Sequence, residues 1–87
     1  MPKTTTRVEN PEYAAFIRRT LGAYARRVAA GDIEALPDMV NLAACLDAAI
    51  TSAVQGLRGF GYSWAEIAAR LGITRQAAQQ RWGGTDG

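Results

Sequence analysis

Apolar residues recur at alternating spacings of three and four along the first third of the chain, which is the period of a helix with one buried face. The stripe consists of Ala14, Ile17, Leu21, Tyr24 and Val28, and Tyr13 and Phe16 widen it. Asn10 and Pro11 supply a cap and a first-turn proline, and Gly31 supplies a stop. The pattern predicts a helix from residue 11 to about residue 30.

The middle of the chain predicts a second and longer helix, from about Asp38 to Arg58. Before it lies a short turn over residues 33–36, which Asp32 caps and Pro37 interrupts. The helix carries a heptad seam made of Met39, Ala43, Leu46, Ile50, Ala53 and Leu57. Further apolar residues lie outside the seam, namely Val40, Leu42, Cys45, Ala49 and Val54. A helix that is apolar nearly all round is central to a core or is shared with a second chain.

Residues 61–83 predict two short helices joined by a tight turn. Ser63 and Glu66 have the spacing of a capping box at the start of the first of them. Gly72 stands where a left-handed residue would end that helix, and Thr74 caps the next one. The side chains expected in the core around this turn are Phe60, Trp64, Ile67, Ala68, Leu71, Ile73, Ala78 and Trp82.

This stretch resembles the helix-turn-helix of DNA-binding proteins, in the simple form found in transcriptional regulators and in the promoter-reading domain of sigma factors. The matching residues are Ile67, Ala68, Leu71, Gly72, Ile73, Thr74 and Ala78. Small side chains at Ala68 and Ala78 allow the two helices to cross closely, and Gly72 takes the positive φ of the turn. The resemblance covers about a quarter of the chain and implies that the second helix enters the major groove of DNA.

The second short helix has an unusual polar face, because it carries glutamines and arginines and no acid. Gln can bind adenine, and Arg can bind guanine, through paired hydrogen bonds in the major groove. The candidate base-reading residues are Arg75, Gln76, Gln79 and Gln80. The candidate phosphate contacts are Ser63, Arg70, Thr74 and Arg81. A plain helical hairpin with a good turn is the alternative interpretation of this stretch.

The formal charge of the chain is only +2, yet its distribution is uneven. Residues 1–31 carry a net +4, residues 32–57 a net −4 and residues 58–82 a net +3, and Asp86 brings the total to +2. Basic ends around an acidic middle fit a polyanion-binding surface backed by an acidic scaffold. The two termini, residues 1–10 and 84–87, are predicted to be a disordered basic arm and a loose end.

The sequence lacks the parts of most catalytic sites. It has no histidine, and its single Cys45 lies in a helical apolar run where we expect a small buried residue. No metal-ligand cluster, phosphate-binding loop or dinucleotide motif appears, so we expect a protein that is not an enzyme and needs no metal or cofactor. No apolar stretch is judged long enough to span a membrane, and no signal core is present. We therefore expect a cytoplasmic protein without membrane contact.

Together these patterns predict an all-α fold, in which an N-terminal two-helix hairpin with a long central helix precedes a C-terminal helix-turn-helix. The hairpin spans residues 11–58 and includes a dimerisation region, and the DNA-binding unit spans residues 59–83. We expect a homodimeric transcriptional regulator that inserts helix 74–82 into the major groove of double-stranded DNA. The alternative is an antitoxin-like or sigma-factor-binding protein-interaction module that keeps this shape without reading DNA. RNA polymerase is a candidate protein partner.

Overall fold

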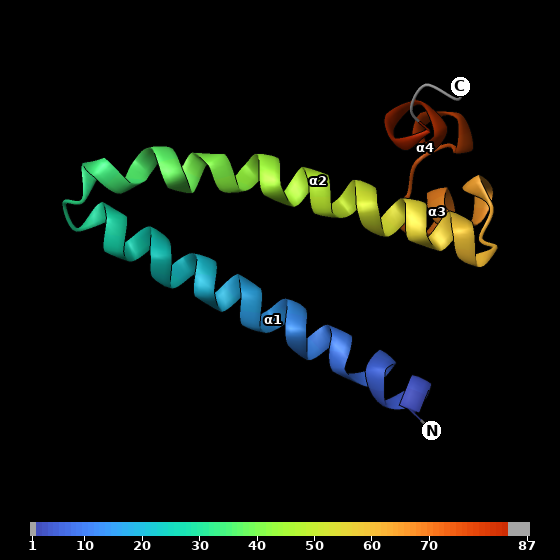
Figure 1. The fold of residues 1–87 in the computed structure, drawn as a ribbon, viewed down its shortest axis with the longest axis horizontal. Coiled ribbons are helices and arrows are strands. Elements are labelled where there is room, and N and C mark those ends of the chain that lie inside the picture. Colours follow the sequence, from blue (N-terminus) through green and yellow to red (C-terminus); the bar gives the residue numbers. More distant parts are fainter. Residues whose placement is uncertain (1, 84–87) are drawn as a thin grey trace. The chain divides into compact units, whose positions relative to one another are not determined.

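The computed structural model describes residues 2–83, and their side chains from Glu9 onward. This part of the chain forms four α-helices and one short 3-10 helix, which confirms the all-α prediction (Figure 1). The elements are α1 (Pro2–Ala29), η1 (Ile33–Ala35), α2 (Leu36–Phe60), α3 (Trp64–Leu71) and α4 (Arg75–Trp82). They divide into two compact units, with the boundary between Val40 and Asn41 inside α2. The expected loose end over residues 84–87 lies outside the described residues.

Helix α1 begins at Pro2, so the predicted start at Pro11 and the predicted disordered arm over residues 1–10 do not match the described backbone. Pro11 lies inside the helix instead of in its first turn. An interior proline removes one backbone hydrogen bond and disfavours a helix, but the turns on either side can carry the helix past it. Sequence reasoning instead took Asn10 and Pro11 as the signal of a helix start.

The end of α1 agrees with the expected glycine stop. Gly31 has a φ of 130°, which favours glycine, and its N–H donates to the carbonyl of Val28 at 3.0 Å. Asp32 makes no side-chain capping hydrogen bond, so its predicted role as a cap is wrong. Its backbone carbonyl accepts from the N–H of Ala35 at 3.2 Å instead. A 3-10 turn closed by the backbone in this way needs no capping side chain.

In unit 2, α2 ends in a Schellman motif. The N–H of Tyr62 donates to the carbonyl of Leu57 at 3.0 Å, the N–H of Gly61 donates to that of Arg58 at 3.0 Å, and Gly61 has a φ of 117°. Phe60 is 79% exposed, so the prediction that it anchors the corner in the core is wrong. The helix continues through Phe60 and turns this side chain about 120° away from the buried Val54. There it stacks on Tyr62, with ring centroids 6.4 Å apart.

The core of unit 2 is small and lies where α3 and α4 meet the C-terminal end of α2. Its buried residues are Val54, Ile67, Ala68, Ala78 and Trp82, with Trp64 packed against them. The predicted burial of the two alanines and of Trp82 is confirmed, and Trp64 is partly buried against them. Leu71 and Ile73, also expected in the core, are 50% and 38% exposed. Both stand at the α3–α4 turn, at the edge of this core.

Most of α2 remains exposed. Cys45 was expected to be buried but is exposed. It precedes Val54 by nine residues, which places the two on opposite sides of the helix. Val54, which the pattern left for a second surface, is instead part of the unit 2 core. The exposed large apolar side chains of α2 are Leu36, Val40, Leu42, Leu46, Ile50, Leu57 and Phe60.

The same helical region corrects the expectation about membrane-spanning length. Among the described residues, Ile33–Phe60 is long and apolar enough, by length and composition alone, to cross a bilayer, because a stretch of 18 residues within it has a mean hydropathy of 1.3. Alanines and few charges produce this value over a helix that also carries Asp38 and Asp47.

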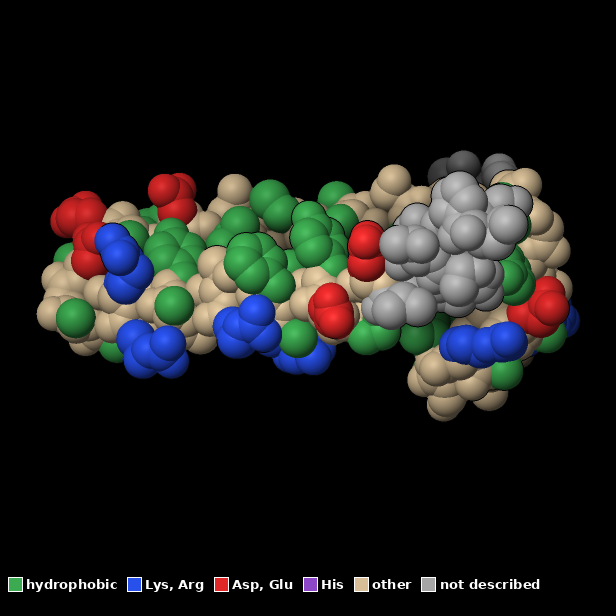
Figure 2. Space-filling view, turned by 90° about the horizontal axis from the view of Figure 1, so that it is seen from below, with side chains coloured by type: hydrophobic (Ala, Val, Ile, Leu, Met, Phe, Trp, Pro, Cys, Tyr) green, Lys and Arg blue, Asp and Glu red, His purple; other side chains and the backbone are tan. Residues whose placement is uncertain are grey.

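In unit 1, α1 has an exposed apolar stripe that includes Tyr13, Phe16 and Ile17. Hydrophobic and basic side chains both lie on the surface of α1 (Figure 2).

Candidate nucleic-acid interface

Helix α3 begins with the predicted capping box. The backbone N–H of Glu66 donates to Oγ of Ser63 at 3.0 Å, and the backbone N–H of Ser63 donates to Oε1 of Glu66 at 2.8 Å. These reciprocal bonds satisfy two N–H groups that the start of a helix leaves without partners. The start of α3 is thus fixed by its own first four residues.

The capping box also sets the ionisation of Glu66. Its pKa is lowered from the ordinary value of 4.5, mainly because the Ser63 backbone N–H donates to the carboxylate. The Ser63 side chain and the positive charge of Arg70 lower this pKa further. A negative Glu66 in the first turn also interacts favourably with the helix dipole.

A turn of three residues joins α3 to α4. Gly72 has a φ of 71°, the left-handed conformation expected at this position, and its N–H donates to the carbonyl of Ala68. Thr74 then caps α4, because its Oγ1 accepts from the N–H of Ala77 at 3.0 Å. Both predicted helix boundaries are confirmed. The positive φ of Gly72 and the hydroxyl of Thr74 thus define this turn.

Close packing of α3 against α4 rests on two alanines. Ala78 is fully buried and Ala68 is 2% exposed. Longer side chains at these positions would hold the helix axes further apart. Helix α4 is therefore held closely against α3 on the side that carries Ala78.

Helix α2 fixes the far end of α4 through a contact that sequence reasoning missed. Nε2 of Gln55 donates to the backbone carbonyl of Trp82 at 2.6 Å, which satisfies an acceptor at the C-terminal end of α4. A second missed residue is Arg58, whose Nη1 donates to the carbonyl of Tyr62 at 3.1 Å and whose guanidinium lies over the Trp64 ring at 4.9 Å. The sequence could have indicated a structural role for Gln55, because it is a polar residue beside Val54 in an apolar helix.

The candidate base-reading residues do not share one environment. Gln76 and Gln80 are exposed and lie on the side of α4 opposite Ala78 and Trp82. Gln79 is half-buried, and its Oε1 accepts from Nη1 of Arg75 at 3.4 Å. This long hydrogen bond joins two of the four candidates along the flank of the helix. The outermost face therefore consists of Gln76, Ala77 and Gln80.

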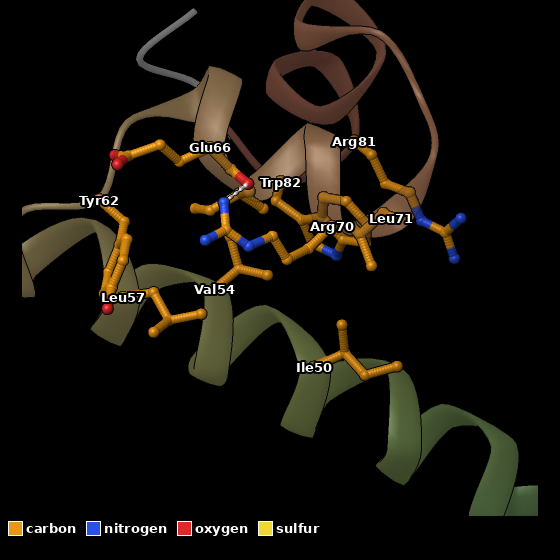
Figure 3. Close-up of a pocket in the computed structure, with 10 residues that line it drawn as sticks. Ile50, Val54, Leu57, Tyr62, Glu66, Arg70, Leu71, Arg81 and Trp82 are labelled. Atoms are coloured by element: carbon orange, nitrogen blue, oxygen red, sulfur yellow. Dashed lines mark hydrogen bonds between the residues drawn. The ribbon is translucent and has the colours of Figure 1, made fainter.

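The candidate phosphate contacts fall into two groups. Ser63 and Thr74 are exposed, and although each hydroxyl oxygen accepts a capping hydrogen bond, each O–H can still donate to a phosphate oxygen. Arg70 and Arg81 line a groove that α2 borders, alongside Leu57, Leu71 and Trp82 (Figure 3). The structure thus places these arginines apart from the outermost face of α4.

Nothing in the described part of the chain gathers three or more His, Cys, Asp or Glu side chains into a group that could hold a metal ion. Comparison of the chain with protein-family models, with curated proteins and with solved structures found no match. The interface is therefore interpreted from its own geometry and chemistry.

Proposed function

We propose that unit 2 is a helix-turn-helix that binds double-stranded DNA and inserts α4 into the major groove. The observation that carries this proposal is the outer face of α4, which presents Gln76 and Gln80 and contains no acid. The opposite side of the same helix is held by buried Ala78 and Trp82. A rigidly held helix with an amide-rich outer face suits recognition of base edges.

The dimensions of α4 fit this role. An α-helix with its side chains is about 10–12 Å across, which matches the width of about 12 Å of the major groove of B-DNA, and the eight residues of α4 are about 12 Å long. Gln76, near the N-terminal end, is the leading candidate for a paired hydrogen bond to adenine. Gln80 follows it on the same face, and Arg75 and Gln79 would contact bases at the edge of this face.

Backbone contacts would fix the position of α4 on the duplex. Ser63 and Thr74 offer hydroxyl donors at the N-termini of α3 and α4, where helix dipoles favour an anion. Arg70 and Arg81 would reach phosphates at the edges of the unit. Contacts of this kind give affinity for any sequence, and the outer face of α4 adds preference for one sequence.

We also propose that the protein acts as a cytoplasmic homodimer built on residues 11–57, as a transcriptional regulator without catalytic activity. One helix as short as α4 reaches only a few base pairs, and paired recognition helices read two half-sites about 34 Å apart. Exposed apolar residues of α1 and α2, such as Phe16, Leu42 and Leu46, supply surface for a second copy. The expected binding site is then an inverted repeat.

The test is affinity for random duplex DNA as a function of salt, followed by selection and sequencing of bound duplexes. We expect binding to weaken steeply with salt and the selected sequences to share a short motif. Salt-independent or absent binding would contradict the proposal. It would favour the second candidate function, a protein-interaction module for RNA polymerase or a similar partner, which the exposed apolar residues of α2 also suit.

A further inference from the structure

Unit 2 contains an open groove of about 480 Å3 between α2 and the α3–α4 pair, which we call the α2–α3–α4 groove. Ile50 and Leu57 of α2 form one wall, and Leu71 and Trp82 form the other (Figure 3). Its volume falls within the range of sites for small organic molecules. The base contacts proposed for the outer face of α4 do not use this groove, whereas Arg70 and Arg81, the proposed phosphate contacts, line it.

The walls of the groove leave apolar surface in water. Leu57 is 43% exposed, Leu71 is 50% exposed and Ile50 is 36% exposed. Removing such surface from water is favourable by about 25 cal/mol per Å2, so an apolar body placed against these three residues would be stabilised. Trp82, which also lines the groove, adds an aromatic surface.

Two cations stand at the edges of the groove. The hydrogen bond of the Arg70 guanidinium goes to the backbone carbonyl of Glu66 at 3.2 Å, which leaves further donors of Arg70 for a ligand. The Arg81 guanidinium lies over the Trp82 ring at 5.0 Å. The acid among the lining residues, Glu66, accepts from the Ser63 N–H, and its carboxylate lies away from Arg70 (Figure 3). The groove therefore combines an apolar interior with a positive edge.

We propose that the α2–α3–α4 groove binds a small carboxylate with an apolar body, of the medium-chain fatty acid class. The apolar body lies between Leu57 and Leu71, and the carboxylate accepts hydrogen bonds from Arg70 or Arg81. The guanidinium fork matches the geometry of a carboxylate. In this site the two arginines bind a carboxylate and not a phosphate. Binding of the carboxylate ligand does not require DNA.

Trp82 provides the readout, because its fluorescence reports a ligand in the groove. We would titrate the protein with octanoate below the concentration at which it forms micelles, and separately with 1-octanol, which has the same chain without the charge. Octanoate should bind saturably, and about tenfold more tightly than octanol, since a charge-assisted hydrogen bond contributes more than 1 kcal/mol. Absence of saturation, or equal affinity for the two ligands, would overturn the proposal.

Variants separate the contribution of the groove from that of net charge. Arg70→Gln and Arg81→Gln should together weaken octanoate binding about tenfold and leave octanol binding unchanged. Arg18→Gln and Arg19→Gln together remove the same two charges from α1 and should change neither affinity. Leu71→Glu, at a half-exposed position, should abolish octanoate binding through like-charge repulsion, with circular dichroism as the check on its fold. If the protein that carries both arginine substitutions binds octanoate like the parent, the proposed site is wrong. Because no DNA is present in this experiment, such a failure leaves the DNA proposal intact.

Discussion

The two ends of the chain are held in different ways. Helices α3 and α4 are short, yet each has a side-chain cap, and the two share a small buried core with α2. Helix α1 has 28 residues, and none of its side chains from Glu9 onward is buried. Helices in water gain most of their stability from packing an apolar face. The comparison teaches that unit 2 carries its own stabilising contacts, whereas the apolar stripe of α1 is exposed, and we propose a partner surface for it.

The largest effect is expected where that partner surface is disrupted. If residues 11–57 form the dimer, Leu42→Glu places an unpaired charge in the interface and should weaken association by about 3 kcal/mol or more. Thr51→Glu adds the same charge on the opposite side of α2 and should leave the dimer intact. Light scattering over a range of concentrations measures both. A monomer mass for the unaltered protein at every concentration would end the dimer proposal.

The next largest expected effect is on the stability of unit 2. It tests whether a small side chain at Ala78 is needed for α3 and α4 to pack closely. Ala78→Leu should force α3 and α4 apart and destabilise unit 2 by about 2–3 kcal/mol, because Ala78 is fully buried in the core that the two helices share. Ala77→Leu inserts the same side chain at an exposed position of α4 and should be nearly neutral. Denaturant unfolding followed by tryptophan fluorescence reports on this unit. Equal stabilities of the two variants would show that the α3–α4 contact is not close-packed.

The predictions from sequence succeeded where a short stretch determines its own structure. The capping box of Ser63 and Glu66, the turn at Gly72 and the cap at Thr74 all depend on residues within four positions of one another. Local patterns of this kind can be identified without the rest of the fold. The buried alanines were also found, because only small side chains suit a close helix crossing.

The failures concern residues whose environment depends on distant parts of the chain. Phe60 and Cys45 are apolar, and apolar character alone predicts burial, but their angular positions on α2 point them away from Val54. Gln55 was missed because its partner, the Trp82 carbonyl, is 27 residues away. The four glutamine and arginine candidates of α4 were treated as one set, although the structure separates the half-buried Gln79 from Gln76 and Gln80.

The different environments of Gln76 and Gln79 can be tested by measuring the sequence preference of DNA binding. Gln76→Ala should relax the preference at one position of the selected sequence and cost about 1–3 kcal/mol there. Gln79→Ala should have a smaller effect, because Gln79 lies on the flank of α4 and already bonds Arg75. Selection from random duplexes with each variant provides the measurement. Unchanged preference in both variants would mean that α4 does not read bases through this face.

The smallest expected effect is on the pH dependence of the stability of unit 2, and it reports on the capping box of Ser63 and Glu66. The pKa of Glu66 is lowered from 4.5, chiefly by the Ser63 N–H, so the folded state favours the charged carboxylate. The unfolded chain keeps the ordinary pKa, and the stabilisation is therefore fully present above that value. It is lost as the pH falls through the lowered pKa of the folded state. Acid should thus weaken unit 2 through this single group.

Glu66→Gln keeps a side-chain oxygen that can accept from Ser63 but removes the titration. The unaltered protein should be the more stable of the two at neutral pH, and the difference should shrink as the pH falls below 4.5, the ordinary pKa of this carboxyl. Glu66→Ala removes the acceptor altogether and should stay less stable than Glu66→Gln at every pH. Denaturant unfolding of the three proteins between neutral and acidic pH gives the comparison. Parallel stability profiles for the unaltered protein and Glu66→Gln would show that the hydrogen bond does not depend on the charge of Glu66.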